Sequence, residues 1–71
     1  MDKTITMDTY RPFNNDPMLV RCYAQLPVIN GPMLYTVGYG MGRSGSNQAF
    51  DRMEEALDEL GFGEYAKVRI Y

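Results

Sequence analysis

The sequence predicts an α+β domain in which one amphipathic helix packs on one face of a mainly antiparallel sheet of three to four strands. Two observations support this fold class. Three segments alternate with the two-residue period of half-buried strands, and the segment between the second and third of them has a helical hydrophobic period. The expected order is strand, strand, helix, strand, with a further N-terminal strand as an option. The 71 residues are expected to form a single domain, 1–71.

The N-terminal residues 1–17 are interpreted either as an edge strand followed by a loop or as a loosely ordered arm. Residues 3–9, KTITMDT, alternate loosely, with Ile5 and Met7 on one side and threonines on the other. Residues 11–17, RPFNNDP, contain two prolines, two asparagines and an aspartate, which is typical of a turn or loop.

The strands expected at residues 18–26, 33–39 and 65–71 alternate clearly enough to assign two faces to each. In the first strand the even-numbered, apolar row should meet the helix, and in the last strand Ala66, Val68 and Ile70 should do so. The pair Asn30 and Gly31 is a turn signal between the first two strands. The opposite, uncovered sheet face is then expected to carry the following residues: Arg21, Tyr23, Gln25, Leu34, Thr36, Lys67, Arg69 and Tyr71.

Residues 46–62, SNQAFDRMEEALDELGF, have the strongest helical period in the chain. Ser46 is expected as the N-cap, because its side-chain oxygen can accept a hydrogen bond from a first-turn amide. Gly61 should end the helix in a left-handed conformation, with Phe62 folding back on Leu57. Apolar residues at spacings of three and four form the stripe expected to be buried: Ala49, Phe50, Met53, Ala56, Leu57 and Leu60.

The uncovered sheet face carries the main functional hypothesis. Tyrosine and arginine are enriched at protein-binding hot spots, so this face is interpreted first as an interface with a protein partner or a second copy. The same residue types stack bases and neutralise phosphates in single-stranded nucleic-acid binders, which is the alternative. A solvated sheet face is the third interpretation. The candidate partner contacts are Arg21, Tyr23, Lys67, Arg69 and Tyr71.

The outer side of the expected helix is acidic. Its carboxylates are Asp51, Glu54, Glu55, Asp58 and Glu59. They are interpreted either as a solvated face that keeps the protein soluble or as a phosphate-like decoy for a basic channel on a partner. The domain is therefore expected to have an acidic helix side and a basic sheet side.

Residues 40–45, GMGRSG, match the pattern G-x-G-x-x-G between a strand and a helix. That fingerprint binds dinucleotides inside a parallel sheet of several βαβ units, whereas a single strand follows the helix here. We therefore expect no cofactor and interpret the segment as a flexible turn. Arg43, Ser44 and Ser46 near the helix start are a candidate contact for an anion or for a partner's carboxylate.

Composition argues against catalysis and metal binding. The chain has no histidine, and Cys22 is its single cysteine, so we expect neither a disulfide, nor a metal site, nor a catalytic residue. A small chain without such reinforcement is expected to pack tightly or to form a homodimer. The net charge of −2 indicates no general attraction to nucleic acid or acidic membranes. The lack of a long apolar run and of a secretory leader predicts a complete cytoplasmic polypeptide with no membrane segment.

A short, acidic, cofactor-free α+β chain with an uncovered sheet face resembles the small inhibitors that bacteriophages encode against host machinery, including anti-CRISPR proteins. This resemblance implies a non-enzymatic protein-binding module that inhibits a larger assembly in the cytoplasm of the host cell. A structural homodimer is a further alternative.

Overall fold

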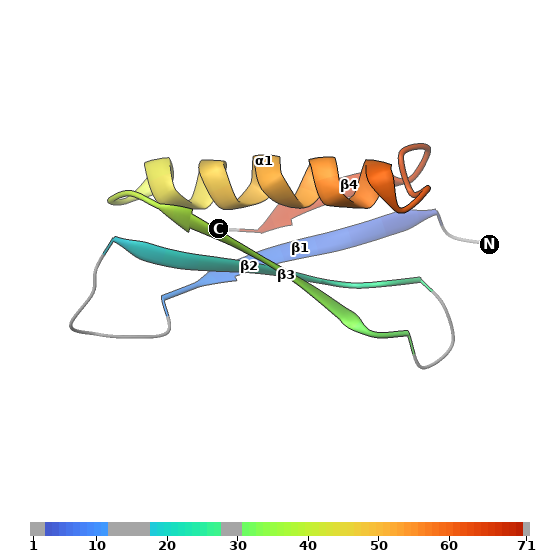
Figure 1. Ribbon diagram of the computed structural model, residues 1–71, viewed down its shortest axis with the longest axis horizontal. Coiled ribbons are helices and arrows are strands. Elements are labelled where there is room, and N and C mark those ends of the chain that lie inside the picture. The colour runs from blue at the N-terminus through green and yellow to red at the C-terminus, as the bar shows by residue number, and fades with distance from the viewer. Residues whose placement is uncertain (1–2, 12–17, 28–30, 71) are drawn as a thin grey trace.

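The structure, a computed structural model, describes residues 3–11, 18–27 and 31–70. Its elements are β1 (Thr4–Tyr10), β2 (Leu19–Gln25), β3 (Met33–Tyr39), α1 (Arg43–Glu59) and β4 (Ala66–Ile70). The strands form a four-stranded sheet in the order β3-β2-β1-β4, and α1 lies along one side of it (Figure 1). β1–β2 and β2–β3 pair antiparallel, whereas β1 and β4 run parallel. The predicted α+β class is confirmed.

β1 lies in the interior of the sheet, between β2 and β4. The N-terminal strand is therefore confirmed, but the edge position expected for it is wrong. β1 is interior because the chain returns through α1 and adds β4 along its other side. Ile5 and Met7 face the helix and are almost completely buried. The expected turns lie largely outside the described residues, which include Arg11 and Gly31 but not residues 12–17 or Asn30.

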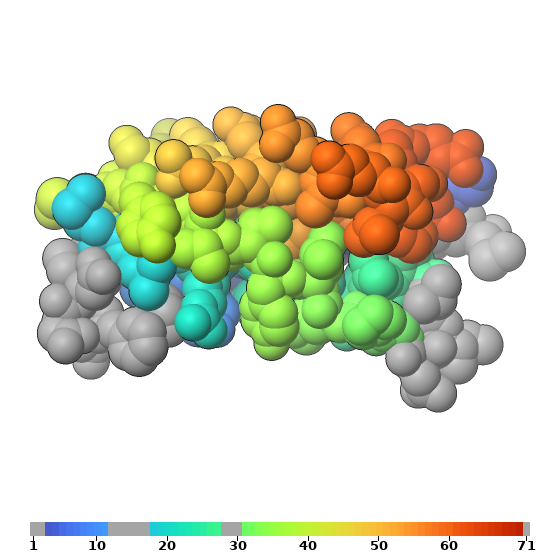
Figure 2. Space-filling view, in the orientation of Figure 1, coloured from blue at the N-terminus to red at the C-terminus, as the bar shows by residue number. Residues whose placement is uncertain are grey.

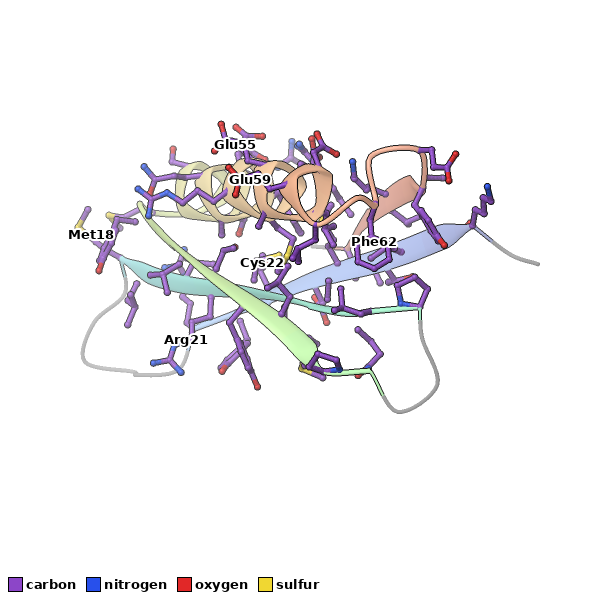
Figure 3. All side chains as sticks on the ribbon, turned by 45° about the vertical axis from the view of Figure 1, so that its right-hand side comes forward. Met18, Arg21, Cys22, Glu55, Glu59 and Phe62 are labelled. Atoms are coloured by element: carbon purple, nitrogen blue, oxygen red, sulfur yellow. The ribbon has the colours of Figure 1, made fainter. Side chains whose placement is uncertain are left out.

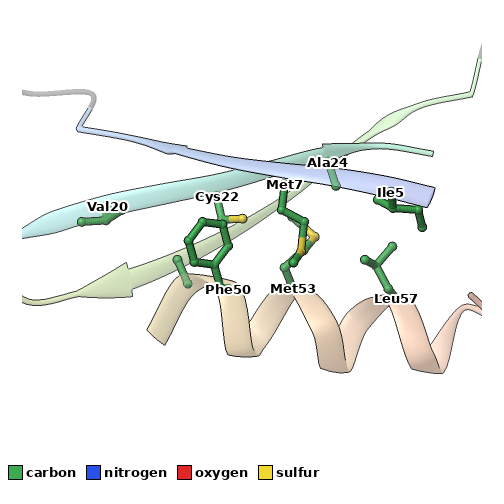
Figure 4. Packing of buried hydrophobic residues seen from close by; sticks show 9 residues of the cluster. Ile5, Met7, Val20, Cys22, Ala24, Phe50, Met53 and Leu57 are labelled. Carbon is green, nitrogen blue, oxygen red and sulfur yellow. The ribbon is translucent and has the colours of Figure 1, made fainter. Parts of the chain in front are cut away.

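The core lies between α1 and the helix-facing rows of β1 and β2 (Figure 4). Its members are Ile5, Met7, Val20, Cys22, Ala24, Ala49, Phe50, Met53 and Leu57. The even-numbered row of β2 faces the helix as predicted, because Val20, Cys22 and Ala24 are each at most 1% exposed. In a core of this size each large side chain carries a substantial part of the stability, and truncating one costs about 2–5 kcal/mol.

The end of α1 was predicted correctly and its start was not. Gly61 has φ of +93°, its N–H bonds to the Asp58 carbonyl, and the Phe62 N–H bonds to the Leu57 carbonyl at 2.8 Å, as in a Schellman ending. The helix begins at Arg43, however, and its N-cap is Gly42, which makes no side-chain cap bond.

Ser46 therefore lies inside α1, and the N-cap predicted for it is wrong. Its hydroxyl lies 3.4 Å from the Thr9 hydroxyl of β1 instead. Leu60 is 55% exposed, so its predicted place in the buried stripe is also wrong. It stands at the C-cap, where the helix ends and the chain turns toward β4.

β3 turns its small side chains toward α1, the reverse of the prediction. A Cβ atom on Gly38 would lie 2.5 Å from the Gly45 carbonyl oxygen and 2.6 Å from the Ala49 nitrogen. The helix and the strand are thus in backbone contact, and their atoms lie directly against one another in Figure 2. Thr36, on the same row, donates to the Ala49 carbonyl at 2.8 Å, and Leu34 packs against the core. The expectation that Leu34 and Thr36 lie on the uncovered face is wrong.

Candidate functional site

The side of the sheet opposite α1 is the candidate functional site, because no helix or strand of the described chain covers it (Figure 1). Strand alternation brings the odd-numbered side chains of β2 and β3 and the even-numbered side chains of β1 and β4 to this open face. Figure 3 shows the alternation in β2, where Arg21 points away from α1 and Cys22 points toward it.

Tyrosines are concentrated where β1, β2 and β3 meet the open face. We define the tyrosine face as Tyr10, Arg21, Tyr23, Tyr35 and Tyr39. Pairing register places Tyr23 beside Tyr35 and Arg21 beside Tyr10. Tyr10, Tyr35 and Tyr39 are 40%, 56% and 57% exposed, so large aromatic area is open to solvent. The Arg21 side chain makes no hydrogen bond or ion pair with another residue of the described ranges.

Tyr23 is held in place by two residues of β1. Its hydroxyl donates to an Asp8 carboxylate oxygen at 3.1 Å, and its ring meets Tyr10 edge-on with centroids 5.8 Å apart. The hydrogen bond to Asp8, followed by the negative charge of that carboxylate, raises the pKa of Tyr23 above its usual value. The second Asp8 oxygen accepts the Thr9 backbone N–H at 2.8 Å. The ring is therefore ordered before any partner binds, which lowers the entropy cost of binding.

β4 turns its cations toward the helix, so their predicted position on the uncovered face is wrong. Lys67 pairs with Asp58, and the Arg69 guanidinium pairs with Asp51 at 3.0 Å and Glu54 at 2.7 Å. The expected separation of an acidic helix side from a basic sheet side is wrong as well. Along the seam between α1 and β4, these two cations pair with three carboxylates.

The position of α1 explains the orientation of β4. The helix packs over β3 and β2, so β4 lies to one side of it and only long side chains span the distance. The Arg69 guanidinium carbon lies 5.4 Å from the centroid of the Phe50 ring, which lets the side chain cover the core edge and contact the ring face. Val68 and Ile70 are left on the open face, 45% and 44% exposed. The β4 part of that face is therefore apolar.

Of the five predicted partner contacts, the structure brings Arg21 and Tyr23 together on the open face. Lys67 and Arg69 lie on the other side of the sheet, and Tyr71 lies outside the described residues. Sequence reasoning missed three members of the tyrosine face, which are Tyr10, Tyr35 and Tyr39. For β3 the available signal was Gly38, because a glycine inside a strand often marks close approach of another backbone.

The five helix carboxylates do not act as one free acidic surface. Asp51, Glu54 and Asp58 are paired with β4. Glu55 and Glu59 point away from the sheet (Figure 3) and make no ion pair with a residue that the structure describes. The decoy hypothesis for this side of the helix stays a prediction.

The glycine-rich segment joins β3 closely to α1. Gly40 has φ of +152°, and a Cβ atom on Gly45 would lie 2.6 Å from the Gly40 carbonyl oxygen. The Arg11 guanidinium, which sequence reasoning overlooked, donates to the carbonyls of Gly40 and Gly42 at 3.3 Å. The segment is the expected turn between the strand and the helix, it has well-defined packing contacts, and its flexibility stays a prediction.

The three residues predicted to contact an anion all lie in the first turn of α1. Arg43 and Ser44 are exposed there, and Ser46 is half-buried beside Thr9. The anion or carboxylate contact stays a prediction for these residues.

Comparison with protein-family models, with curated proteins and with solved structures finds no match to this chain. Within the described ranges, no helix is long and apolar enough to cross a membrane. The cytoplasmic location stays a prediction.

Proposed function

We propose that this chain is a non-enzymatic protein-binding module that docks through the tyrosine face. The partner surface is apolar at its centre and carries a carboxylate that pairs with Arg21. The observation that carries the proposal is the exposure of Tyr10, Tyr35 and Tyr39, at 40–57%, around Arg21, whose guanidinium has no hydrogen bond or ion pair among the described residues.

The size of the exposed aromatic area supports this proposal. Each tyrosine has an accessible area of roughly 200 Å², and about half of it is exposed in Tyr10, Tyr35 and Tyr39, so the three together expose roughly 300 Å². Exposed patches of that size, about 300–600 Å², are among the largest on ordinary monomers and often serve binding. Tyr35 and Tyr23 present broad rings with few rotatable bonds, so little conformational entropy is lost when a partner covers them.

The charge distribution favours protein over nucleic acid as the partner. Arg21 is a single cation among the tyrosines, and the Asp8 carboxylate lies two residues from Tyr10 on the same face. Lys67 and Arg69, the cations expected to contact phosphates, are neutralised by helix carboxylates on the other side of the sheet. Nucleic-acid binding depends on clustered cations, which this face lacks among its described residues.

The resemblance to phage-encoded inhibitors extends the proposal to inhibition of a larger assembly. Size, acidic composition and fold class support this narrower statement. Docking on the tyrosine face does not depend on it.

The test is affinity capture from the source cell with matched variants, followed by titration of the retained protein. Arg21→Glu and Tyr35→Ala should each weaken its binding by at least about fivefold, since truncating a hot-spot residue costs more than about 1 kcal/mol. Glu55→Gln, on the outer side of α1, is the control and should bind like the wild type. A partner that binds all four proteins equally, or a retained ligand that nuclease removes, would overturn the proposal.

A further inference from the structure

The two edge strands of the sheet, β3 and β4, differ in whether side chains of α1 bond to their outward-pointing backbone groups. On β3, the Arg52 guanidinium donates to the Val37 carbonyl at 2.8 Å, and the Gln48 side-chain oxygen accepts the Tyr39 N–H at 2.5 Å. Val37 and Tyr39 belong to the residues whose backbone groups point away from β2. Side chains from α1 thus occupy part of the hydrogen-bonding edge that another strand would need, a usual protection of edge strands.

At the β4 edge, no side chain of α1 bonds to the backbone of Lys67 among the described residues. The Ala66 N–H bonds to the Lys3 carbonyl at 2.8 Å, so Ala66, Val68 and Ile70 direct their backbone groups toward β1. By alternation, the backbone groups of Lys67 point to the other side, where no strand of the described chain lies. The Lys67 side chain does not protect this edge, because it turns to Asp58 on the helix.

We propose that β4 pairs antiparallel with β4 of a second copy, about a two-fold axis at Val68. The two four-stranded sheets then join into one sheet of eight strands. The proposal does not depend on the proposed function, because it concerns the edge of the sheet and not the tyrosine face.

The residues of β4 suit pairing with themselves. About an axis at Val68, the two Val68 side chains meet on the open face, and each Ala66 lies opposite Ile70 of the second copy. These residues are apolar, and Val68 and Ile70 are 45% and 44% exposed in the single chain, so pairing buries them. On each side of the axis, the small Ala66 side chain therefore lies opposite the larger Ile70 side chain of the other copy. A foreign strand would need the same apolar row, whereas a second copy supplies it by symmetry.

Charge on the helix side is also compatible with a second copy. Lys67 lies opposite Arg69 of the second copy, and like charges in that position would repel. Each cation already has carboxylates from its own helix, Asp58 for Lys67 and both Asp51 and Glu54 for Arg69. The joined seam therefore holds four cations among six carboxylates.

The test is disulfide cross-linking of the purified chain with Val68→Cys. In this register Val68 forms a non-hydrogen-bonded pair with its counterpart, with Cα atoms about 4.5 Å apart, within the range for a disulfide. Native Cys22 does not interfere, because it is completely buried and burial raises the pKa of its thiol to about 12. Mild oxidation should convert most of the Val68→Cys protein to a covalent dimer.

Thr6→Cys is the matched control, since Thr6 lies beside Val68 on β1 and is exposed on the same face. It should form no covalent dimer under the same oxidation. Equal dimer formation by both variants would indicate face-to-face contact and overturn the edge pairing. A Val68→Cys protein that forms no covalent dimer would also overturn it.

A second pair of variants tests the edge without a cysteine. Lys67→Pro removes an N–H that points away from β1, and Lys67→Ala removes the same side chain while keeping the N–H. In sedimentation, the wild type and Lys67→Ala should rise from 8.1 kDa toward twice that mass with concentration. Lys67→Pro should remain at the monomer mass with an unchanged circular-dichroism spectrum. Wild-type protein that stays at 8.1 kDa up to several hundred micromolar contradicts the proposal.

Discussion

Gly38→Ala is expected to be the most damaging single-methyl substitution in the contact between β3 and α1. The added Cβ would lie 2.5 Å from the Gly45 carbonyl oxygen, 2.6 Å from the Ala49 nitrogen and 3.1 Å from the Ala49 Cα. All three atoms are backbone, so no side chain can rotate away and the helix itself must move. Overpacking of this kind lowers the free energy of unfolding by about 1–3 kcal/mol. Because the backbone atoms of Gly45 and Ala49 cannot easily move aside, we expect a loss near the upper value.

That cost is large for a chain of 71 residues, whose unfolding free energy is about 4–10 kcal/mol. Because each kcal/mol shifts the Tm of a domain this small by about 4–8 °C, we expect a Tm lower by roughly 10–20 °C. Urea unfolding followed by circular dichroism would measure the loss as a lower midpoint with an unchanged slope.

Two controls separate backbone contact from other causes. Gly63→Ala changes the unfolded chain in the same way, but its Cβ would come closest to the end of the exposed Asp58 side chain, at 3.2 Å, and the variant should be near neutral. Gly38→Ala combined with Ala49→Gly should not recover stability, since the clash is with backbone atoms of Ala49. A Gly38→Ala protein within about 0.5 kcal/mol of wild type, or one restored by Ala49→Gly, would refute the reasoning.

The remaining predictions concern the ion-pair seam and the buried thiol. Arg69→Met keeps an apolar side chain over Phe50 but loses the pairs with Asp51 and Glu54, so unfolding free energy should fall by about 0.5–1.5 kcal/mol. The difference from wild type should shrink in 1 M salt, and a salt-independent difference would contradict the ion-pair explanation. Burial raises the pKa of the Cys22 thiol from 9.0 to about 12, so its contribution to stability is complete below pH 9 and is lost as pH rises toward 12. Cys22→Ala should flatten this alkaline decline in denaturant titrations, and an unchanged decline would assign it to other groups.

The C-terminal end of α1 could be predicted from sequence because its signals are local. Gly61 supplies the left-handed residue, and Phe62 follows it to complete the Schellman bonds. The start could not be found in the same way. Gly42 caps the helix without a side-chain bond, and the hydroxyl of Ser46 approaches Thr9, a contact that depends on the tertiary fold.

The faces of the strands show a second limit of sequence patterns. In β2 one row is apolar and the other contains Arg21 and Tyr23, so the assignment of faces was correct. In β3 and β4 alternation is equally clear, but the row that meets the helix depends on how far the helix lies from the strand. The backbone of α1 lies so close to β3 that the row facing it must contain a residue without a side chain, Gly38. The helix lies farther from β4, so the row facing it consists of the long side chains of Lys67 and Arg69.

The off-centre position of α1 accounts for both proposed interaction surfaces. Backbone contact with Gly38 leaves no room for large side chains on the helix side of β3, so Tyr35 and Tyr39 lie on the open face. On the other side of the sheet, the helix reaches β4 through ion pairs, which direct the cations inward and leave Val68 on an apolar outer row. If the helix lay nearer the centre of the sheet, its backbone contact with Gly38 would loosen, and the long cationic side chains of β4 would have less space beneath it. Because the strand that this contact positions also carries Tyr35 and Tyr39, Gly38→Ala should weaken partner binding as well as stability.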